Sequence, residues 1–323
     1  MVVFIVILII FAVLAAGFFI GSRIAYGMSF ERRGDGKPDP YVGLERESFL
    51  PYSEKIRASI DRLSATPCEE IRIKSHDGLT LFGRYYHVRD GAPTEIQLHG
   101  YRSVSLKDFS GGGCAALDSG FNLLLVDQRA HGESEGRTIS FGINERLDCL
   151  AWARYLDERF GGSTPIVLVG VSMGAATVLM ASELELPESV VCAVADCPYS
   201  TPKDIIIKVA NGMGLPGRLL FPLVRAGARM YGGFSIMGGS PVAAAAGSRL
   251  PTMIIHGDSD GFVPCEMSGE IFDAIPHENK SRVIFEGADH GLSFIVDQPR
   301  YVGLVNEFIR DSVDRWNEKR GKK

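Results

Sequence analysis

The hydrophobic pattern of the chain begins with a long run that contains neither a charged residue nor a proline. The run spans residues 2–21 and reads VVFIVILIIFAVLAAGFFIG. As an α-helix it would be roughly 30 Å long, which matches the hydrocarbon core of a bilayer. A secretory signal peptide needs basic residues ahead of a shorter apolar stretch, and no lysine or arginine precedes this run. We therefore predict an uncleaved transmembrane anchor at residues 1–21.

Basic residues follow the apolar run, at Arg23, Arg32, Arg33 and Lys37. Because cytoplasmic flanks carry an excess of lysine and arginine, this bias predicts a single-pass protein whose remaining chain lies in the cytoplasm. Residues 22–66 are predicted to form a juxtamembrane arm, in which a Gly/Pro-rich turn region precedes one amphipathic helix.

From residue 69 onward, short apolar runs alternate with stretches of helical periodicity. The predicted strands are 69–75, 80–87, 94–99, 122–127, 165–170, 190–196, 251–257 and 281–287, and the predicted helices are 107–119, 143–160, 173–184, 265–275 and 298–319. Nearly continuous apolar strands separated by helices are typical of a mostly parallel, doubly wound sheet. The fold class is therefore α/β, with one domain at residues 67–323.

One segment interrupts this alternation. Residues 198–250, between the sixth and seventh predicted strands, are rich in glycine and helical in pattern. Open α/β sheets bind ligands at the carboxyl edge of their strands. We predict that this insertion is a helical cap over that edge.

Composition narrows the function classes. The chain has a net charge of -5, no long basic stripe, and six cysteines whose spacing fits neither a zinc site nor a disulfide framework. We expect no nucleic-acid partner, no metal and no cofactor.

The pattern G-x-S-x-G occurs three times, around Ser134, Ser172 and Ser259. A nucleophile elbow needs a buried strand before the serine and a helix after it. Only Ser172 has both, because polar residues precede Ser134 and no helix follows it. Ser259 follows a strand, but Asp258 and Asp260 flank it and would oppose the developing negative charge.

A nucleophilic serine needs a histidine base that a carboxylate orients. After Ser172 come His256 inside an apolar strand, His277 in a polar turn, and His290 in a loop behind the last strand. We predict His290 as the base. His131, which precedes the serine, is a weaker alternative.

Five motifs in this order resemble the α/β-hydrolases, and in particular the Bem46-like and ABHD-type group, over residues 69–319. The motifs are HGYRS at 99–103, DQRAHGESEG at 127–136, GVSMG at 170–174, HGDSDGFVP at 256–264 and GADHG at 287–291.

The resemblance implies roles for further residues. The family pattern D-x-x-V-P matches Asp260 as the acid and leaves Asp258 too early. The backbone N–H groups of Tyr101 and Met173 would form the oxyanion hole. Asp127, Arg129 and His131 match a loop that braces the surroundings of the serine.

The predicted function is a serine hydrolase that cleaves a carboxylic ester, thioester or amide through an acyl-enzyme on Ser172. Acyl transfer by the same triad and a catalytically silent, membrane-anchored binding module are the alternatives. The predicted partners are an acyl substrate, including lipid-like ones, and the membrane.

Overall fold

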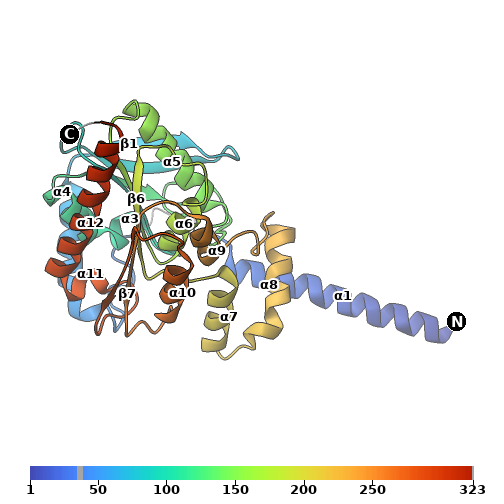
Figure 1. The fold of residues 1–323 in the computed structure, drawn as a ribbon. Helices are drawn as coiled ribbons and strands as arrows, with labels where there is room; N and C mark the ends of the chain where they lie inside the picture. The colour runs from blue at the N-terminus through green and yellow to red at the C-terminus, as the bar shows by residue number, and fades with distance from the viewer. Residues whose placement is uncertain (35–38, 322–323) are drawn as a thin grey trace.

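The computed structural model describes residues 1–34 and 39–321, and an eight-stranded sheet forms its centre (Figure 1). The strand order is β1-β2-β4-β3-β5-β6-β7-β8, with β2 antiparallel to β1 and β4 and all other neighbours parallel. The strands are β1 (Glu69–Lys74), β2 (Thr80–Tyr86), β3 (Thr94–Leu98), β4 (Asn122–Asp127), β5 (Ile166–Val171), β6 (Val190–Asp196), β7 (Thr252–Gly257) and β8 (Lys280–Phe285). The predicted mostly parallel α/β sheet is confirmed.

Helices cover both faces of the sheet. The described helices of this part are α2 (Ser53–Ala65), α3 (Ser105–Asp108), α4 (Ser110–Asp118), α5 (Glu145–Arg159), α6 (Met173–Ala181), α10 (Glu266–Ala274), α11 (Ser293–Val296) and α12 (Gln298–Lys319). One apolar cluster joins the sheet to α5, α6 and α10, and another joins its other face to α4 and α12. Strands buried on both faces in this way need apolar residues at nearly every position, which explains the unbroken runs in the sequence.

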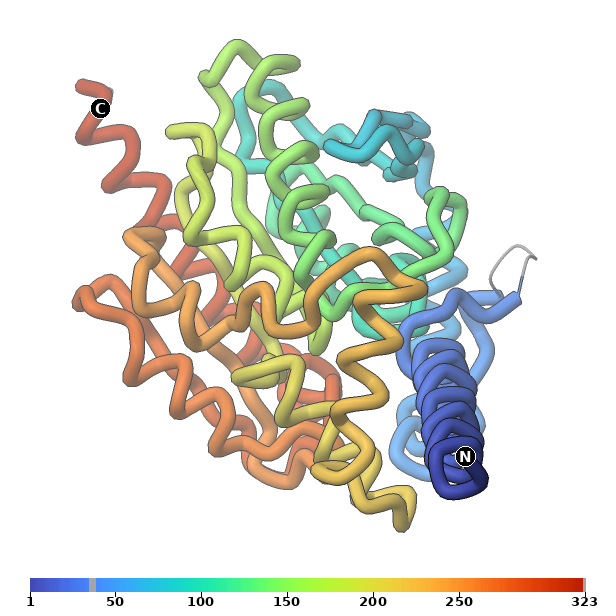
Figure 2. The backbone as a smooth tube through the Cα atoms, turned by 90° about the vertical axis from the view of Figure 1, so that its right-hand side faces the viewer, coloured from blue at the N-terminus to red at the C-terminus, as the bar shows by residue number. Residues whose placement is uncertain are grey.

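The N-terminal helix α1 (Val2–Ser29) projects away from the rest of the molecule in Figure 1, and Figure 2 views it from its N-terminal end. It is long and apolar enough to cross a membrane by length and composition, and the window that meets this criterion is not buried. The helix does not stop at the predicted end of the anchor but continues through residues 22–29. These residues belong to the segment that is predicted to form the juxtamembrane arm.

The extension is helical because it packs on α8 (Gly217–Tyr231). A Cβ at Gly227 would lie 2.5 Å from the carbonyl oxygen of Ser22, so the glycine allows the two helices to approach closely. The Tyr231 hydroxyl also donates to the carbonyl of Phe19 over 3.3 Å. This contact joins two segments far apart in the chain, which is why periodicity alone did not reveal it.

The remaining arm contains α2, where the amphipathic pattern predicted a helix, and a short 3-10 helix η1 (Leu50–Tyr52) precedes it. Lys37, one of the basic residues used to orient the anchor, lies outside the described residues. Between β6 and β7 lie α7 (Pro202–Gly212), α8 and α9 (Pro241–Gly247). That these three helices cap the site stays a prediction.

Candidate active site

Ser172 occupies a sharp turn between β5 and α6. Its backbone has φ 55° and ψ -113°, a left-handed conformation that is strained for a residue with a side chain. A Cβ at Gly170 would lie 2.2 Å from the carbonyl oxygen of Gly174, and one at Gly174 would lie 1.8 Å from that of Leu98. The two flanking glycines are therefore required by space, and the turn presents the serine hydroxyl at the carboxyl edge of the sheet.

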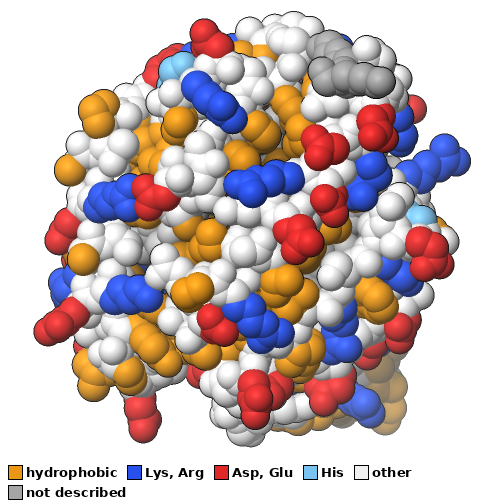
Figure 3. All heavy atoms as spheres, turned by 60° about the vertical axis from the view of Figure 1, so that its left-hand side comes forward, with side chains coloured by type: hydrophobic (Ala, Val, Ile, Leu, Met, Phe, Trp, Pro, Cys, Tyr) orange, Lys and Arg blue, Asp and Glu red, His pale blue; other side chains and the backbone are white. Residues whose placement is uncertain are grey.

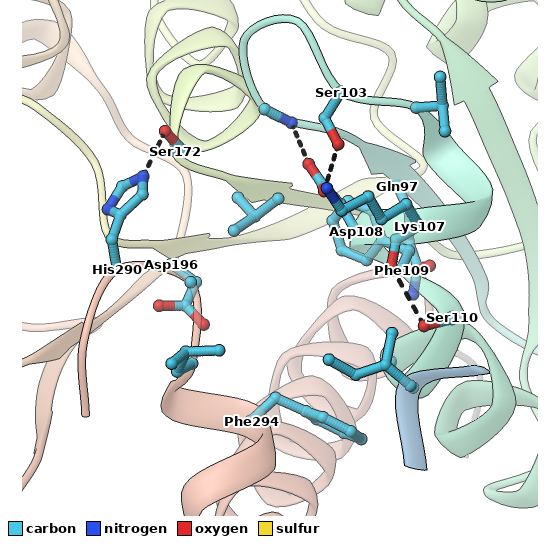
Figure 4. Close-up of a pocket in the computed structure, with 18 of the residues that line it drawn as sticks. Gln97, Ser103, Lys107, Asp108, Phe109, Ser110, Ser172, Asp196, His290 and Phe294 are labelled. Atoms are coloured by element: carbon cyan, nitrogen blue, oxygen red, sulfur yellow. Dashed lines mark hydrogen bonds between the residues drawn. The ribbon is translucent and has the colours of Figure 1, made fainter. Parts of the chain in front are cut away.

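A continuous hydrogen-bonded chain runs from this serine to a buried carboxylate. The Oγ of Ser172 lies 2.9 Å from Nε2 of His290, and Nδ1 of the same ring lies 2.7 Å from Oδ2 of Asp260. Figure 4 shows the imidazole of His290 turned toward Ser172. With a proton on Nδ1, the ring donates to the carboxylate and accepts the serine proton at Nε2.

Several donors converge on Asp260, whose side chain is fully buried. Its Oδ1 accepts the backbone N–H groups of Phe262 and Val263, at 2.8 Å and 2.7 Å. Burial raises the pKa of Asp260, but the hydrogen bonds from His256 and His290 outweigh it and hold the pKa below its ordinary value. The carboxylate therefore stays ionised and can orient His290.

His256 lies beside the acid Asp260, and the sequence did not reveal this contact. Its Nε2 lies 3.2 Å from Oδ2 of Asp260 and 3.0 Å from the carbonyl oxygen of Val263. The apolar run around it predicts only a structural residue at this position. Its position at the end of β7, four residues before the acid, was the available signal.

The competing serines and the competing acid lie in other environments. The Ser134 hydroxyl is buried and donates to the carbonyl of Asp127 over 2.5 Å. The Ser259 hydroxyl donates to Asp258 over 3.0 Å, and that carboxylate accepts the N–H of Gly287 over 2.7 Å. Within the described residues, only Ser172 among these three serines has a histidine partner.

The resemblance assigns the oxyanion hole to the backbone N–H groups of Tyr101 and Met173, and this assignment stays a prediction. Within residues 1–34 and 39–321, neither Tyr101 nor Met173 donates its backbone N–H to another group of the chain. Both are therefore available for a substrate oxygen. The loop that carries Tyr101 is held on both sides, because Asp108 accepts the N–H of Gly100 over 2.8 Å and His131 accepts that of Arg102 over 3.0 Å.

This arrangement gives His131 a bracing position. Its Nε2 is occupied by the N–H of Arg102, and its Nδ1 lies 2.9 Å from the carbonyl of Arg129. Burial holds the pKa of His131 well below its ordinary value, so the ring is neutral. The weaker alternative, in which His131 acts as the base, receives no support from these contacts.

The same loop contacts the end of α1. The Tyr101 hydroxyl donates to the carbonyl of Ser29 over 2.9 Å, and the Arg102 guanidinium donates to the carbonyls of Met28 and Glu31 over 2.9 Å and 3.2 Å. Arginine beside the last carbonyls of a helix satisfies groups that have no partner within the helix. The end of the N-terminal helix is thus packed against one side of the candidate oxyanion hole.

A cavity of about 930 Å³ opens beside Ser172 and His290 (Figure 4). The arm and α2 supply one wall, through Arg32, Arg46, Phe49, Lys55 and Ile56 among others. None of the described residues that line it comes from residues 198–250. The part played by the arm is a finding that the sequence did not predict, since it depends on contacts between distant segments.

One group of side chains has the composition of a metal site. Ligand atoms of Cys197, Asp260 and His290 all lie within 4.8 Å of one another. Asp260 and His290 already bond each other, and burial raises the pKa of the Cys197 thiol well above its ordinary value. A thiol that stays protonated is a poor ligand, so these residues do not fit a metal centre.

Comparison with known proteins agrees with this geometry. The sequence profile of the alpha/beta hydrolase family matches residues 98–302. The uncharacterized protein YqkD of Bacillus subtilis is 27% identical over 199 residues, which cover 61% of this chain and 65% of YqkD. The match therefore spans just under two thirds of the length of that relative. The uncharacterized protein YfhR of Salmonella typhi is 23% identical over 74% of this chain and 79% of its own.

Solved structures show the same fold. An esterase from Pyrococcus furiosus, Pf2001, superimposes with a TM-score of 0.62 at 25% identity, over 78% of this chain and 94% of its own. The esterase RhEst1 from Rhodococcus sp. ECU1013 gives a TM-score of 0.54 at 18% identity, over 75% and 98% of the two chains.

Proposed function

Since the chain belongs to the alpha/beta hydrolase family, we propose that it is a serine hydrolase that cleaves a carboxylic ester, thioester or amide. The observation that carries the proposal is the hydrogen-bonded chain from Ser172 through His290 to Asp260. The printed description of Pf2001 as an esterase supports the same reaction class.

In the proposed reaction, the Ser172 Oγ attacks the acyl carbon while His290 takes its proton at Nε2. Asp260 holds Nδ1 and stabilises the imidazolium that forms. His290 then returns the proton to the leaving group, and the acyl group remains on Ser172. Water, deprotonated by the same imidazole, releases the acid and restores the serine.

The N–H groups of Tyr101 and Met173 are the proposed donors to the oxygen that becomes negative in each tetrahedral intermediate. Removing one such donor typically costs about 3 kcal/mol of transition-state stabilisation. The bracing of the Tyr101 loop by Asp108 and His131 would keep one donor in place before the substrate binds.

We also propose that α1 anchors the protein in a membrane, with the catalytic domain in the cytoplasm, as in the membrane-anchored group named above. The apolar length of α1 supports the anchor, and the basic residues after it support the orientation. Protease added to intact cells should leave the domain whole. Digestion of the domain under these conditions would reverse the orientation.

The function is tested by hydrolysis of 4-nitrophenyl and thioester substrates of different acyl lengths, and of matched amides. The full-length protein in detergent should turn over at least one of these classes, and Ser172→Ala should lower kcat by about four orders of magnitude or more. Equal rates in the two proteins would overturn the proposal.

A further inference from the structure

The central strand β3 carries two polar side chains on a face of the sheet where the neighbouring strands carry apolar ones. Glu95 and Gln97 are 4% and 1% exposed, whereas their register partners on β4 and β5 are Leu123, Leu125, Val167 and Val169. Buried polar groups on a sheet face are costly unless they are paired. Both side chains line the cavity that contains Ser172 (Figure 4 labels Gln97).

The pairing of these two side chains is incomplete. The Gln97 amide donates to Oε2 of Glu95 over 2.7 Å, but its own oxygen, Oε1, is buried and has no partner. An acceptor left unpaired in the interior costs about 1–3 kcal/mol. A group that donates a hydrogen bond there would recover that free energy.

The facing helix α4 has three glycines in its first turn, where a Cβ at Gly111 would lie 2.4 Å from the ring of Phe294. Its first turn reads Ser110-Gly111-Gly112-Gly113, although glycine costs about 1 kcal/mol relative to alanine inside a helix. A Cβ at Gly113 would lie 3.6 Å from Oε1 of Gln97, so the amide oxygen faces this turn. Gly111 and Gly112 line the cavity.

The register fixes how deep this group lies. Gln97 pairs with Val169, three residues before Ser172 along β5, which corresponds to about 10 Å at the rise of a strand. An extended chain advances about 3.5 Å over three bonds, so roughly eight atoms of an acyl chain would reach from the serine to Gln97.

We propose that the deep end of the cavity is a subsite for a hydroxyl group carried near the far end of a medium-length acyl chain, with Gln97 accepting its hydrogen bond and Glu95 beside it. The inference rests on the proposed acyl-enzyme chemistry for its placement of the acyl carbon. A neutral donor fits better than an ammonium group, because burial raises the pKa of Glu95 to about 7 and leaves much of it uncharged at neutral pH.

The test compares 4-nitrophenyl esters of ω-hydroxy acids with those of the matching plain acids, from six to twelve carbons. For the wild-type protein, kcat/KM should favour the hydroxylated ester about tenfold, with the maximum near eight to ten carbons. The double variant Glu95→Leu/Gln97→Leu should lose or reverse this preference, since it replaces the whole polar pair by apolar groups.

The matched control is Thr94→Val, on the same strand. Thr94 is a fully buried polar residue, and it is not among the residues that line the cavity. This variant should keep the preference for the hydroxylated ester. Its loss there would mean that any polar change on β3 alters the ratio, and would overturn the assignment.

A separate binding experiment tests this inference independently of the proposed function. Calorimetry on Ser172→Ala should show 8-hydroxyoctanoate binding about tenfold more tightly than octanoate, and the added double substitution should remove the difference. If Ser172 proves dispensable for hydrolysis, the proposed function is rejected, but the binding measurement still tests the subsite. Equal binding of the two acids would show that the donor to the Gln97 oxygen is an internal water and not the hydroxyl of the ligand. The subsite would then be rejected.

Discussion

At the residue scale, Asp260 stands out because four donors converge on its carboxylate, namely the rings of His256 and His290 and the backbone N–H groups of Phe262 and Val263. Asp258 lies two residues earlier and bonds instead to Ser259 and to the N–H of Gly287. The pair therefore offers a comparison in which two neighbouring carboxylates differ in their partners and not in their chemistry.

Asp260→Asn should lower kcat by about four orders of magnitude, because an amide in place of the carboxylate favours the wrong tautomer of His290. Asp258→Asn is the matched control and should stay within about tenfold of the wild type. Steady-state kinetics with one ester substrate measures both. A larger loss from Asp258→Asn would exchange the two assignments.

Glu95 offers a second prediction at this scale. Burial raises its folded-state pKa from 4.5 to about 7, so the folded protein binds more protons than the unfolded chain between these values. Its contribution therefore lowers the free energy of unfolding as pH rises from about 4.5 to 7, by about 3 kcal/mol in total.

Denaturant titrations of the full-length protein in detergent, taken every half pH unit, measure this. The difference in unfolding free energy between Glu95→Gln and wild type should change across this pH window and level off above it. Parallel curves for the two proteins would show that Glu95 does not titrate in this range.

At the element scale, the turn between β5 and α6 is the feature on which the candidate site depends most. Gly174→Ala would push a Cβ into the backbone of Leu98, the last residue of β3, and so move the strand that leads to Tyr101. We expect this variant to lose at least a hundredfold in kcat/KM or to unfold at a lower temperature.

Gly303→Ala in α12 is the control, because nothing lies within 4 Å of its Cβ position. Alanine there should raise the free energy of unfolding by up to about 1 kcal/mol and leave kcat/KM unchanged. Ester kinetics and thermal unfolding decide the comparison. An active and stable Gly174→Ala would contradict the described turn.

The elements show which parts of the structure a sequence can predict. The eight strands and the elbow at Ser172 follow local patterns, apolar runs and paired glycines, and the structure confirms their existence and type. The polar residues Glu95 and Gln97 also left a visible signal, since E-I-Q alternates in a strand that is otherwise central and buried. Alternation alone did not indicate that both would share one cavity.

At the scale of the whole molecule, the parts that sequence analysis missed are contacts between distant segments. Residues 22–29 are helical because α8 packs on them. Phe49 and Lys55 line the cavity because α2 packs against α4. No local pattern encodes which distant surface a segment will meet. The assignment of residues 22–66 to a juxtamembrane arm therefore stays a prediction, and it did not include these contacts.

The outer face of α8 leads to a prediction at this scale. Arg218, Arg225 and Arg229 are exposed on it, and Leu219 is 75% exposed. No acidic residue occurs in this helix, whereas basic and acidic side chains intermingle on the face shown in Figure 3. Because α8 packs beside the end of the apolar helix, its basic face would lie near a membrane surface.

A fragment of residues 22–323, which keeps the close approach of Ser22 to Gly227 on α8, should bind vesicles with anionic lipid more tightly than neutral ones. Each arginine near such a surface contributes about 1 kcal/mol, so replacing all three by glutamine should weaken sedimentation with anionic vesicles by about a hundredfold or more. Arg154→Gln/Arg310→Gln, which changes two exposed arginines elsewhere, is the control. Equal binding by the triple variant and the control would exclude α8 as a membrane contact.

We propose that Ser172, alone among the three serines in G-x-S-x-G patterns, is activated as a nucleophile. A fluorophosphonate probe, which phosphonylates such serines, measures this directly when the labelled residue is located by peptide mass spectrometry. We expect one label on Ser172 in the wild type, unchanged labelling of Ser134→Ala and Ser259→Ala, and no labelling of Ser172→Ala. Labelling that persists in Ser172→Ala, or that maps to another serine, would contradict it.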